Sequence, residues 1–178
     1  VIERSAKIIR GNPLDTDTQV GAQASAEQFE RIMDYIAIGK AEGVKVLLGG
    51  DVAKMGNGLD KGFYIQPTLL FGQNNMRVFQ EEIFGPVMSI MPFDTEEEVL
   101  KFANSTQYGL AAVLWTQDIT RANRMAMDLH TGIVWINCWL LRDLRTPFGG
   151  AKDSGVGREG GFEALHFFTE AKNVCVKF

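Results

Sequence analysis

Three sets of residues in this sequence have types and spacings that could carry chemistry: a glycine-rich stretch, two cysteines and two arginines. Gly155, Gly157 and Gly160 fit the G-x-G-x-x-G pattern, which can cradle a dinucleotide pyrophosphate at the start of a helix. That role needs a strand directly before the glycines, a helix directly after them, and an acidic residue about 20 residues beyond the motif. Here residues 147–154 are predicted to be a loop, and the acidic position falls beyond Phe178. We therefore interpret the glycines as a tight turn where backbone approaches backbone.

The cysteines, Cys138 and Cys175, lie far apart and in no CxxC or Cys/His pattern. With only two histidines in the chain, this spacing favours neither a disulfide framework nor a zinc site, so we expect no metal. We predict that both thiols are small buried hydrophobic side chains in a reducing compartment.

The arginines, Arg142 and Arg145, stand in a largely apolar stretch, residues 139–148. A guanidinium binds a carboxylate through two parallel hydrogen bonds, so this pair could recognise an acidic ligand. The alternative is a structural ion pair with Asp143 or another neighbouring acid. Composition sets further limits: the net charge of -4 argues against nucleic acid as the main partner. No apolar run reaches the length of about 20 residues that crosses a bilayer.

The elements that must position these residues follow from the hydrophobic period. Ser25 is predicted to cap a helix that runs to about Ala41, with Gln28 completing a capping box and Gly43 ending it. Its apolar stripe consists of Phe29, Ile32, Met33, Ile36 and Ala37. A strand at 44–48 follows, and then a loop or hairpin at 51–62 that contains Asn57-Gly58.

Further strands are expected at 64–70, where Pro67 weakens the pattern, and at 87–93, 111–115 and 132–136. Asp94 and Asp118 are predicted to cap the helices between the last three strands. This alternation predicts an α/β fold, a parallel sheet with helices on both faces. A short helix and a terminal strand, 173–178, complete the chain, and we expect that strand to pair outside the sheet, with another subunit.

Glu81-Glu-Ile-Phe-Gly-Pro-Val87 resembles the EEIFGPV motif of the aldehyde dehydrogenase superfamily. Further matches follow the order and spacing of that family: Gly11-Asn-Pro13, Gly62-Phe-Tyr64, Gln66-Pro-Thr68, Tyr108-Gly-Leu110, Asn137-Cys138, Pro147-Phe-Gly-Gly150 and Gly157-Arg-Glu159. The resemblance covers the whole chain. It implies that residues 1–172 are the C-terminal part of a catalytic domain and that 173–178 form an oligomerisation strand.

The resemblance also implies a nicotinamide cofactor, NAD with NADP as the alternative. In the family the second glutamate of the motif, here Glu82, binds the nicotinamide ribose, and Phe84 packs against the nicotinamide end. Gln28 and Arg31 correspond to residues that reach the same ribose. From the residues alone, Glu82 could equally be a solvated carboxylate, Gln28 a capping-box partner and Arg31 an exposed charge.

Residues 139–148 correspond to the loop that lines the aldehyde tunnel of the family, so Arg142, Arg145 and Phe148 become candidate substrate residues. This stretch resembles the 2-hydroxymuconic and 2-aminomuconic semialdehyde dehydrogenases of aromatic-ring degradation, whose substrates carry a carboxylate. Residues 71–80 instead resemble dehydrogenases of small aliphatic aldehydes. The chain is therefore either an intermediate subfamily or a join of two relatives.

The family places its nucleophilic cysteine and general-base glutamate upstream of the region that this chain resembles, so we expect no catalytic residue in the chain. Val1 is predicted to enter partway along a helix. We therefore expect an inactive fragment of a cytoplasmic, homo-oligomeric enzyme that acts on a small-molecule aldehyde. The alternative is a scaffold or interaction module that has this fold without catalysis.

Overall fold

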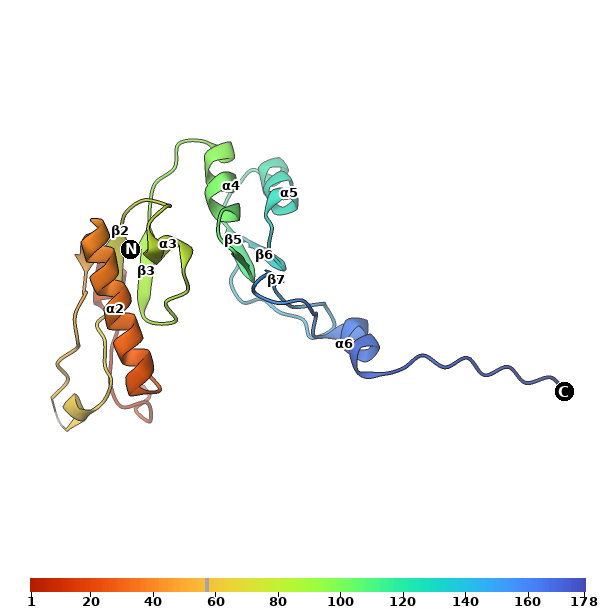
Figure 1. Cartoon of the computed structure of the whole chain (residues 1–178), viewed down its shortest axis with the longest axis horizontal. Coiled ribbons are helices and arrows are strands. Elements are labelled where there is room, and N and C mark those ends of the chain that lie inside the picture. Colours follow the sequence, from red (N-terminus) through yellow and green to blue (C-terminus); the bar gives the residue numbers. More distant parts are fainter. Residues whose placement is uncertain (57) are drawn as a thin grey trace. The chain divides into compact units, whose positions relative to one another are not determined.

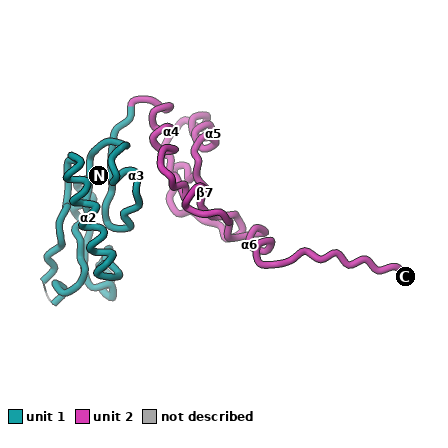
Figure 2. Tube along the Cα trace, viewed as in Figure 1, with its two compact units in different colours: residues 1–93 teal, residues 94–178 magenta. Residues whose placement is uncertain are grey.

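The structure is a computed structural model that describes residues 1–56 and 58–178, and it divides into two compact units, Val1–Phe93 and Asp94–Phe178 (Figures 1 and 2). Both units combine helices with short strands, so the predicted α/β class is confirmed. Among the described helices, none is long and apolar enough to cross a membrane. The boundary expected between residues 172 and 173 stays a prediction.

The first unit is built on a three-stranded sheet. Its central strand is β2 (Thr68–Phe71), with β3 (Val87–Ile90) parallel and β1 (Lys45–Leu48) antiparallel to it. The antiparallel β1 departs from the expected parallel sheet because the connection to β2 contains no crossover helix. The helical elements of this unit are α1 (Ile2–Ala6), α2 (Ala26–Glu42), the 3-10 turn η1 (Leu59–Lys61) and α3 (Arg77–Gln80).

Helix α2 begins and ends where the sequence predicts. The Ser25 hydroxyl accepts a hydrogen bond from the backbone N–H of Gln28 (3.1 Å), and Gly43 ends the helix in the left-handed region (φ 93°). The apolar stripe is confirmed as the core face, since Ile32 and Ile36 are fully buried. The core cluster consists of Ile32, Ile36, Val44, Ile65, Leu70, Val78 and Ile83.

The strand expected at 64–70 begins later, at Thr68. Pro67 has no N–H to donate, so regular pairing starts only after it, and Ile65 makes an isolated antiparallel bridge to Val52. The turn expected at Asn57-Gly58 cannot be followed, because Asn57 lies outside the described residues.

In the second unit the strand–helix–strand order gives a parallel pair, as predicted. Strands β5 (Ala111–Leu114) and β6 (Ile133–Ile136) pair in parallel and are joined by α5 (Ile119–Asp128). The remaining elements are α4 (Glu96–Asn104), α6 (Gly161–Phe168) and the strands β4 (Tyr108–Gly109) and β7 (Ala151–Lys152), which pair antiparallel.

One of the two aspartate caps expected in this unit is confirmed and the other is wrong. Asp118 caps α5. Its carboxylate accepts hydrogen bonds from the backbone N–H groups of Arg121 and Thr120, and these bonds hold the pKa of Asp118 below its ordinary value. For α4 the capping residue is Thr95, not Asp94, and its hydroxyl accepts from the Glu98 N–H. Thr95 directly precedes the first helical residue, the position from which a side chain reaches that N–H.

Residues 169–178, all of which the structure describes, are exposed and form neither helix nor strand. The expected strand at 173–178 is therefore not formed within the chain itself. Val174, Val176 and Phe178 alternate with other residues at the two-residue period of a strand. The pairing of this segment with another subunit stays a prediction.

Candidate functional site

The segment that carries the EEIFGPV motif connects α3 to β3 and packs against α2. At Gly85 an added Cβ would lie 2.5 Å from Cδ1 of Ile32, which has no exposed surface. A larger residue would force the segment away from the helix, because the core around Ile32 is close-packed. Glycine at this position therefore fixes how closely residues 81–86 approach α2.

Two of the predicted cofactor residues, Gln28 and Arg31, hold the backbone of this segment. The Gln28 side-chain amide donates to the carbonyl oxygens of Ile83 (3.1 Å) and Phe84 (2.7 Å). The Arg31 guanidinium donates to the carbonyl oxygen of Glu82 (3.0 Å). The side-chain half of the predicted capping box is therefore wrong: Gln28 bonds to carbonyls far along the chain instead of returning to Ser25.

The other two predicted cofactor residues, Glu82 and Phe84, have exposed side chains. Glu82 is exposed, and its carboxylate makes no hydrogen bond or ion pair with any residue that the structure describes. Phe84 leaves 74% of its surface exposed and adopts a left-handed backbone conformation, φ 59°. That conformation costs about 1–3 kcal/mol in a residue with a bulky side chain. Strained backbone with an exposed ring is typical of functional segments rather than of packing.

The preceding residue, Glu81, has the opposite environment. Its carboxylate accepts two hydrogen bonds from Arg77 (2.7 and 2.8 Å) and one from the Tyr35 hydroxyl (2.8 Å). Hydrogen bonds from Arg77 and then Tyr35 lower the pKa of Glu81 from 4.5 to about 2, so it stays ionised at neutral pH. The Glu-Glu pair thus divides into a tethered Glu81 and an unpaired Glu82.

Sequence reasoning missed Tyr35, Arg77 and Glu81. Two signals were available. Gln28, Arg31 and Tyr35 lie at i, i+3 and i+7, the spacing of one helix face. Arg77 and Glu81 lie at i and i+4, the spacing of a side-chain ion pair.

In the second unit, the segment 139–148 is tied to β6. The Trp135 indole donates to the carbonyl oxygen of Leu141 (2.9 Å), and the Trp135 and Trp139 rings meet edge to face with centroids 5.4 Å apart. The Arg142 guanidinium lies 3.9 Å from the centroid of the Phe148 ring and donates to Glu159 (2.8 Å). Stacking on an aromatic ring fixes the plane of a guanidinium, and so determines which way its donors point.

The ion-pair alternative left open for the arginines is what the structure shows within this chain. Arg142 pairs with Glu159, and Arg145 pairs with Asp143 two residues away. The Arg145 hydrogen bonds hold the pKa of Asp143 below its ordinary value. Arg145 leaves 87% of its side chain exposed and Arg142 leaves 36%, so Arg142 is the more buried of the two and its ion pair is the less screened by solvent.

The interpretation of the glycines as a turn with close backbone contact is confirmed for Gly160 but not for Gly155 and Gly157, where an added Cβ would meet no atom closer than 3.6 Å. A Cβ at Gly149 would overlap the carbonyl oxygen of Gly157, and one at Gly160 would lie 2.6 Å from the carbonyl oxygen of Thr146. An antiparallel bridge between Phe148 and Glu159 closes the turn. The strand nearest to the glycines is the two-residue, antiparallel β7 rather than a strand that leads directly into them.

The prediction of two buried thiols is wrong. Cys138 is half-buried just after β6, and Cys175 is exposed in the unpaired terminal segment. Both lie outside the helices and strands of the chain as described. Among residues 1–56 and 58–178, no three His, Cys, Asp or Glu side chains gather where they could hold a metal ion.

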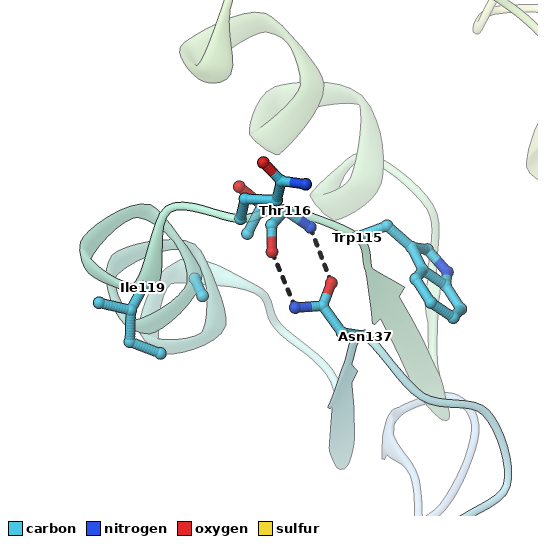
Figure 3. A pocket seen from close by; sticks show the side chains of 6 residues that line it. Trp115, Thr116, Ile119 and Asn137 are labelled. Atoms are coloured by element: carbon cyan, nitrogen blue, oxygen red, sulfur yellow. Dashed lines mark hydrogen bonds between the residues drawn. The ribbon is translucent and has the colours of Figure 1, made fainter.

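A cavity of about 610 Å³ opens at the carboxyl ends of β5 and β6, lined by Trp115, Thr116, Gln117, Ile119, Ala122 and Asn137 (Figure 3). The Asn137 side chain accepts from the Thr116 N–H (2.9 Å) and donates to its carbonyl oxygen (2.7 Å). Asn137 itself adopts a left-handed conformation, φ 54°, which asparagine tolerates better than most residues. These two hydrogen bonds join the carboxyl ends of β5 and β6 beside the cavity.

Comparison with known proteins identifies the class. The aldehyde dehydrogenase family model matches residues 1–174, so this chain belongs to the aldehyde dehydrogenase family. Acetaldehyde dehydrogenase of Pseudomonas aeruginosa is 51% identical over 178 residues, 100% of this chain and 35% of that protein. The 2-aminomuconic 6-semialdehyde dehydrogenase of a Pseudomonas species is 46% identical over 166 residues, 93% of this chain and 34% of that protein.

Solved structures agree with this assignment. HpcC of Thermus thermophilus matches with a TM-score of 0.93 and 44% identity, over 100% of this chain and 37% of that one. A betaine aldehyde dehydrogenase variant of Staphylococcus aureus, solved with NAD⁺, matches with a TM-score of 0.90 and 39% identity, over 94% and 34%. The chain thus spans about a third of the length of its relatives.

Proposed function

We propose that this chain is the C-terminal part of an NAD-dependent aldehyde dehydrogenase and forms one wall of its cofactor site. The observation that carries the proposal is the segment 81–86, where Glu82 is exposed and unpaired while its neighbours are held. A free carboxylate can accept both hydroxyl protons of a ribose, and the exposed Phe84 ring can orient the nicotinamide. The structural relative solved with NAD⁺ supports this cofactor, with NADP as the alternative.

In this proposal Gln28 and Arg31 contribute mainly by fixing the segment. Arg31 donates one hydrogen bond to the Glu82 carbonyl, and its remaining donors can reach a ribose oxygen. When bound, the cofactor would supply the hydride acceptor for a reaction in which an aldehyde and water give an acid. The residues of this chain bind and orient; the nucleophile and the base belong to the upstream part of the family sequence.

The isolated 178-residue chain is accordingly expected to produce no NADH from acetaldehyde or from a semialdehyde. The full-length enzyme, assayed by absorbance under the same conditions, is the positive control. NADH formation by the pure chain would contradict the assignment of catalysis to upstream residues.

The cofactor role of Glu82 can be tested by Glu82→Gln in the full-length enzyme. We expect the Kd for NADH and the KM for NAD to rise about tenfold, the effect of weakening charge-assisted hydrogen bonds. The KM for the aldehyde should change little. Glu30→Gln, which removes an exposed carboxylate of α2, is the matched control. Equal NADH affinity in the two variants would exclude Glu82 from the cofactor site.

For the substrate we propose an aldehyde with a remote carboxylate, of the muconic semialdehyde class that arises in aromatic catabolism. Support comes from Arg142, which is ordered by stacking on Phe148, and from the aminomuconic semialdehyde relative. A carboxylate that displaces Glu159 from the guanidinium would keep the charge of Arg142 paired. Arg145 is exposed and would contribute less.

A small neutral aldehyde is the second candidate. The acetaldehyde dehydrogenase relative favours it, and so does the existing ion pair with Glu159, which already neutralises the charge of Arg142. A homo-oligomer in the cytoplasm belongs to the same proposal. The alternating apolar residues of 173–178 fit an intersubunit strand, and two free thiols fit a reducing compartment.

A further inference from the structure

Helix α2 presents a third polar residue, Tyr35, to the segment that carries Glu82 and Phe84. We propose that Tyr35, acting through Glu81, is a positioning residue that sets the direction of Glu82 in the cofactor site. The inference rests on the proposed role of Glu82. It assigns a function to Glu81, the member of the Glu-Glu pair that bonds to the protein rather than to the proposed cofactor.

The contacts of Glu81 are directional. Its Oε1 accepts from Arg77 Nε (2.7 Å), and its Oε2 accepts from both Arg77 Nη2 (2.8 Å) and the Tyr35 hydroxyl (2.8 Å). The two arginine bonds fix the plane of the carboxylate, but both come from the short helix α3 just before it in the chain. The Tyr35 bond is the one that ties this carboxylate to helix α2.

Anchoring Glu81 determines where Glu82 points. Glu81 has extended backbone angles, φ -112° and ψ 148°, and adjacent side chains on extended backbone point in opposite directions. With Glu81 held toward α2, Glu82 must face away from it. The Arg31 bond to the Glu82 carbonyl holds the next peptide group against the same helix face.

The Tyr35 ring joins these contacts. The guanidinium carbons of Arg31 and Arg77 lie 5.6 and 5.7 Å from its centroid, within the range of cation–π attraction. One arginine holds the Glu81 side chain and the other holds the Glu82 backbone. A single ring therefore contacts both groups that set the conformation of the Glu-Glu pair.

Positioning and stability can be separated at this residue. The segment is kept near α2 by Gly85 against the buried Ile32, a contact that does not involve Tyr35. Tyr35→Phe removes the hydroxyl and keeps the ring on which the arginines stack. Such a variant is expected to fold with Glu81 freed from α2.

The experiment measures NADH affinity by fluorescence titration of the full-length enzyme. Tyr35→Phe should raise the Kd for NADH and the KM for NAD about five- to tenfold, as for one charge-assisted hydrogen bond, and leave kcat at saturating NAD within about twofold. The matched control is Tyr64→Phe. Tyr64 is buried in the same unit, and its hydroxyl donates to the Gly11 carbonyl oxygen (3.0 Å). Tyr64→Phe should lower the thermal midpoint of unfolding without changing the Kd for NADH. If Tyr35 were merely structural, Tyr35→Phe would have the same effect as this control.

A double-mutant cycle tests whether Tyr35 acts through Glu81. Glu81→Ala should weaken NADH binding, and adding Tyr35→Phe to it should have no further effect. Additive effects, or an unchanged Kd in Tyr35→Phe, would overturn the positioning role. Glu82→Gln separates the two proposals: if it weakens NADH binding while Tyr35→Phe does not, only the role of Tyr35 fails. If Glu82→Gln leaves NADH binding unchanged, the cofactor site is misplaced and both proposals fail.

Discussion

Arg142→Ala in the full-length enzyme is expected to lower kcat/KM for a carboxylate-bearing semialdehyde by about thirtyfold, or about 2 kcal/mol of transition-state binding. A neutral aldehyde of similar length should lose little. The guanidinium stacks on Phe148 and the Arg142 side chain is 36% exposed, so an incoming carboxylate could meet donors already held in one plane. Ratios of kcat/KM for the two substrates, measured with wild type and variant, give the result directly.

Two further variants make the comparison specific. Lys101→Ala removes an exposed cation of α4 and should leave the ratio of the two substrates unchanged. Glu159→Gln removes the internal partner of Arg142 and should raise kcat/KM for the acidic substrate, because that carboxylate competes with the substrate for the same donors. If Arg142→Ala lowers kcat/KM equally for both substrates, the pair with Glu159 is structural, and the neutral-aldehyde candidate is favoured.

The parts of the fold that follow from local sequence period could be predicted. The stripe of Ile32 and Ile36 marked the buried face of α2, and Ser25 and Gly43 marked its ends, because each of these signals acts within one or two helical turns. The parallel β5–β6 pair followed from its crossover helix. Asp94 and Thr95 are neighbouring candidates for the cap of α4, and the hydrophobic period does not locate the start of a helix to within one residue.

The candidate site could be predicted in its members but not in their contacts. A capping box would join the Gln28 side chain to the backbone N–H of Ser25. Its amide instead bonds to two carbonyl oxygens of the segment 81–86, and only the folded chain brings that segment close to α2. The left-handed Phe84 is likewise invisible in the sequence, since nothing local requires it. The motif therefore predicts Glu82 as a candidate, while the reason that Glu82 is free and Glu81 is not comes from tertiary structure.

Gly132→Ala is expected to destabilise the full-length enzyme by about 3 kcal/mol or more, the effect of a contact that a packed structure cannot relieve. A Cβ at this position would overlap the carbonyl oxygen of Gly149 and lie 2.7 Å from its carbonyl carbon. All the atoms in conflict belong to backbone, so no side-chain rotation can make room. Gly157→Ala is the matched control, because a Cβ there meets no atom within 4 Å, and it should be neutral or slightly stabilising. Urea unfolding of the three proteins measures both effects.

The same variant links packing to substrate choice. Gly149 lies next to Phe148, on which Arg142 stacks, so separating Gly149 from Gly132 would shift the ring that orders the guanidinium. In the folded fraction of Gly132→Ala, the preference for the acidic substrate should therefore fall toward that of Arg142→Ala, while NADH affinity stays unchanged. If Gly132→Ala is as stable as Gly157→Ala, the close backbone approach does not fix this segment. The stacking on Phe148 would then have to hold Arg142 without support from the glycines.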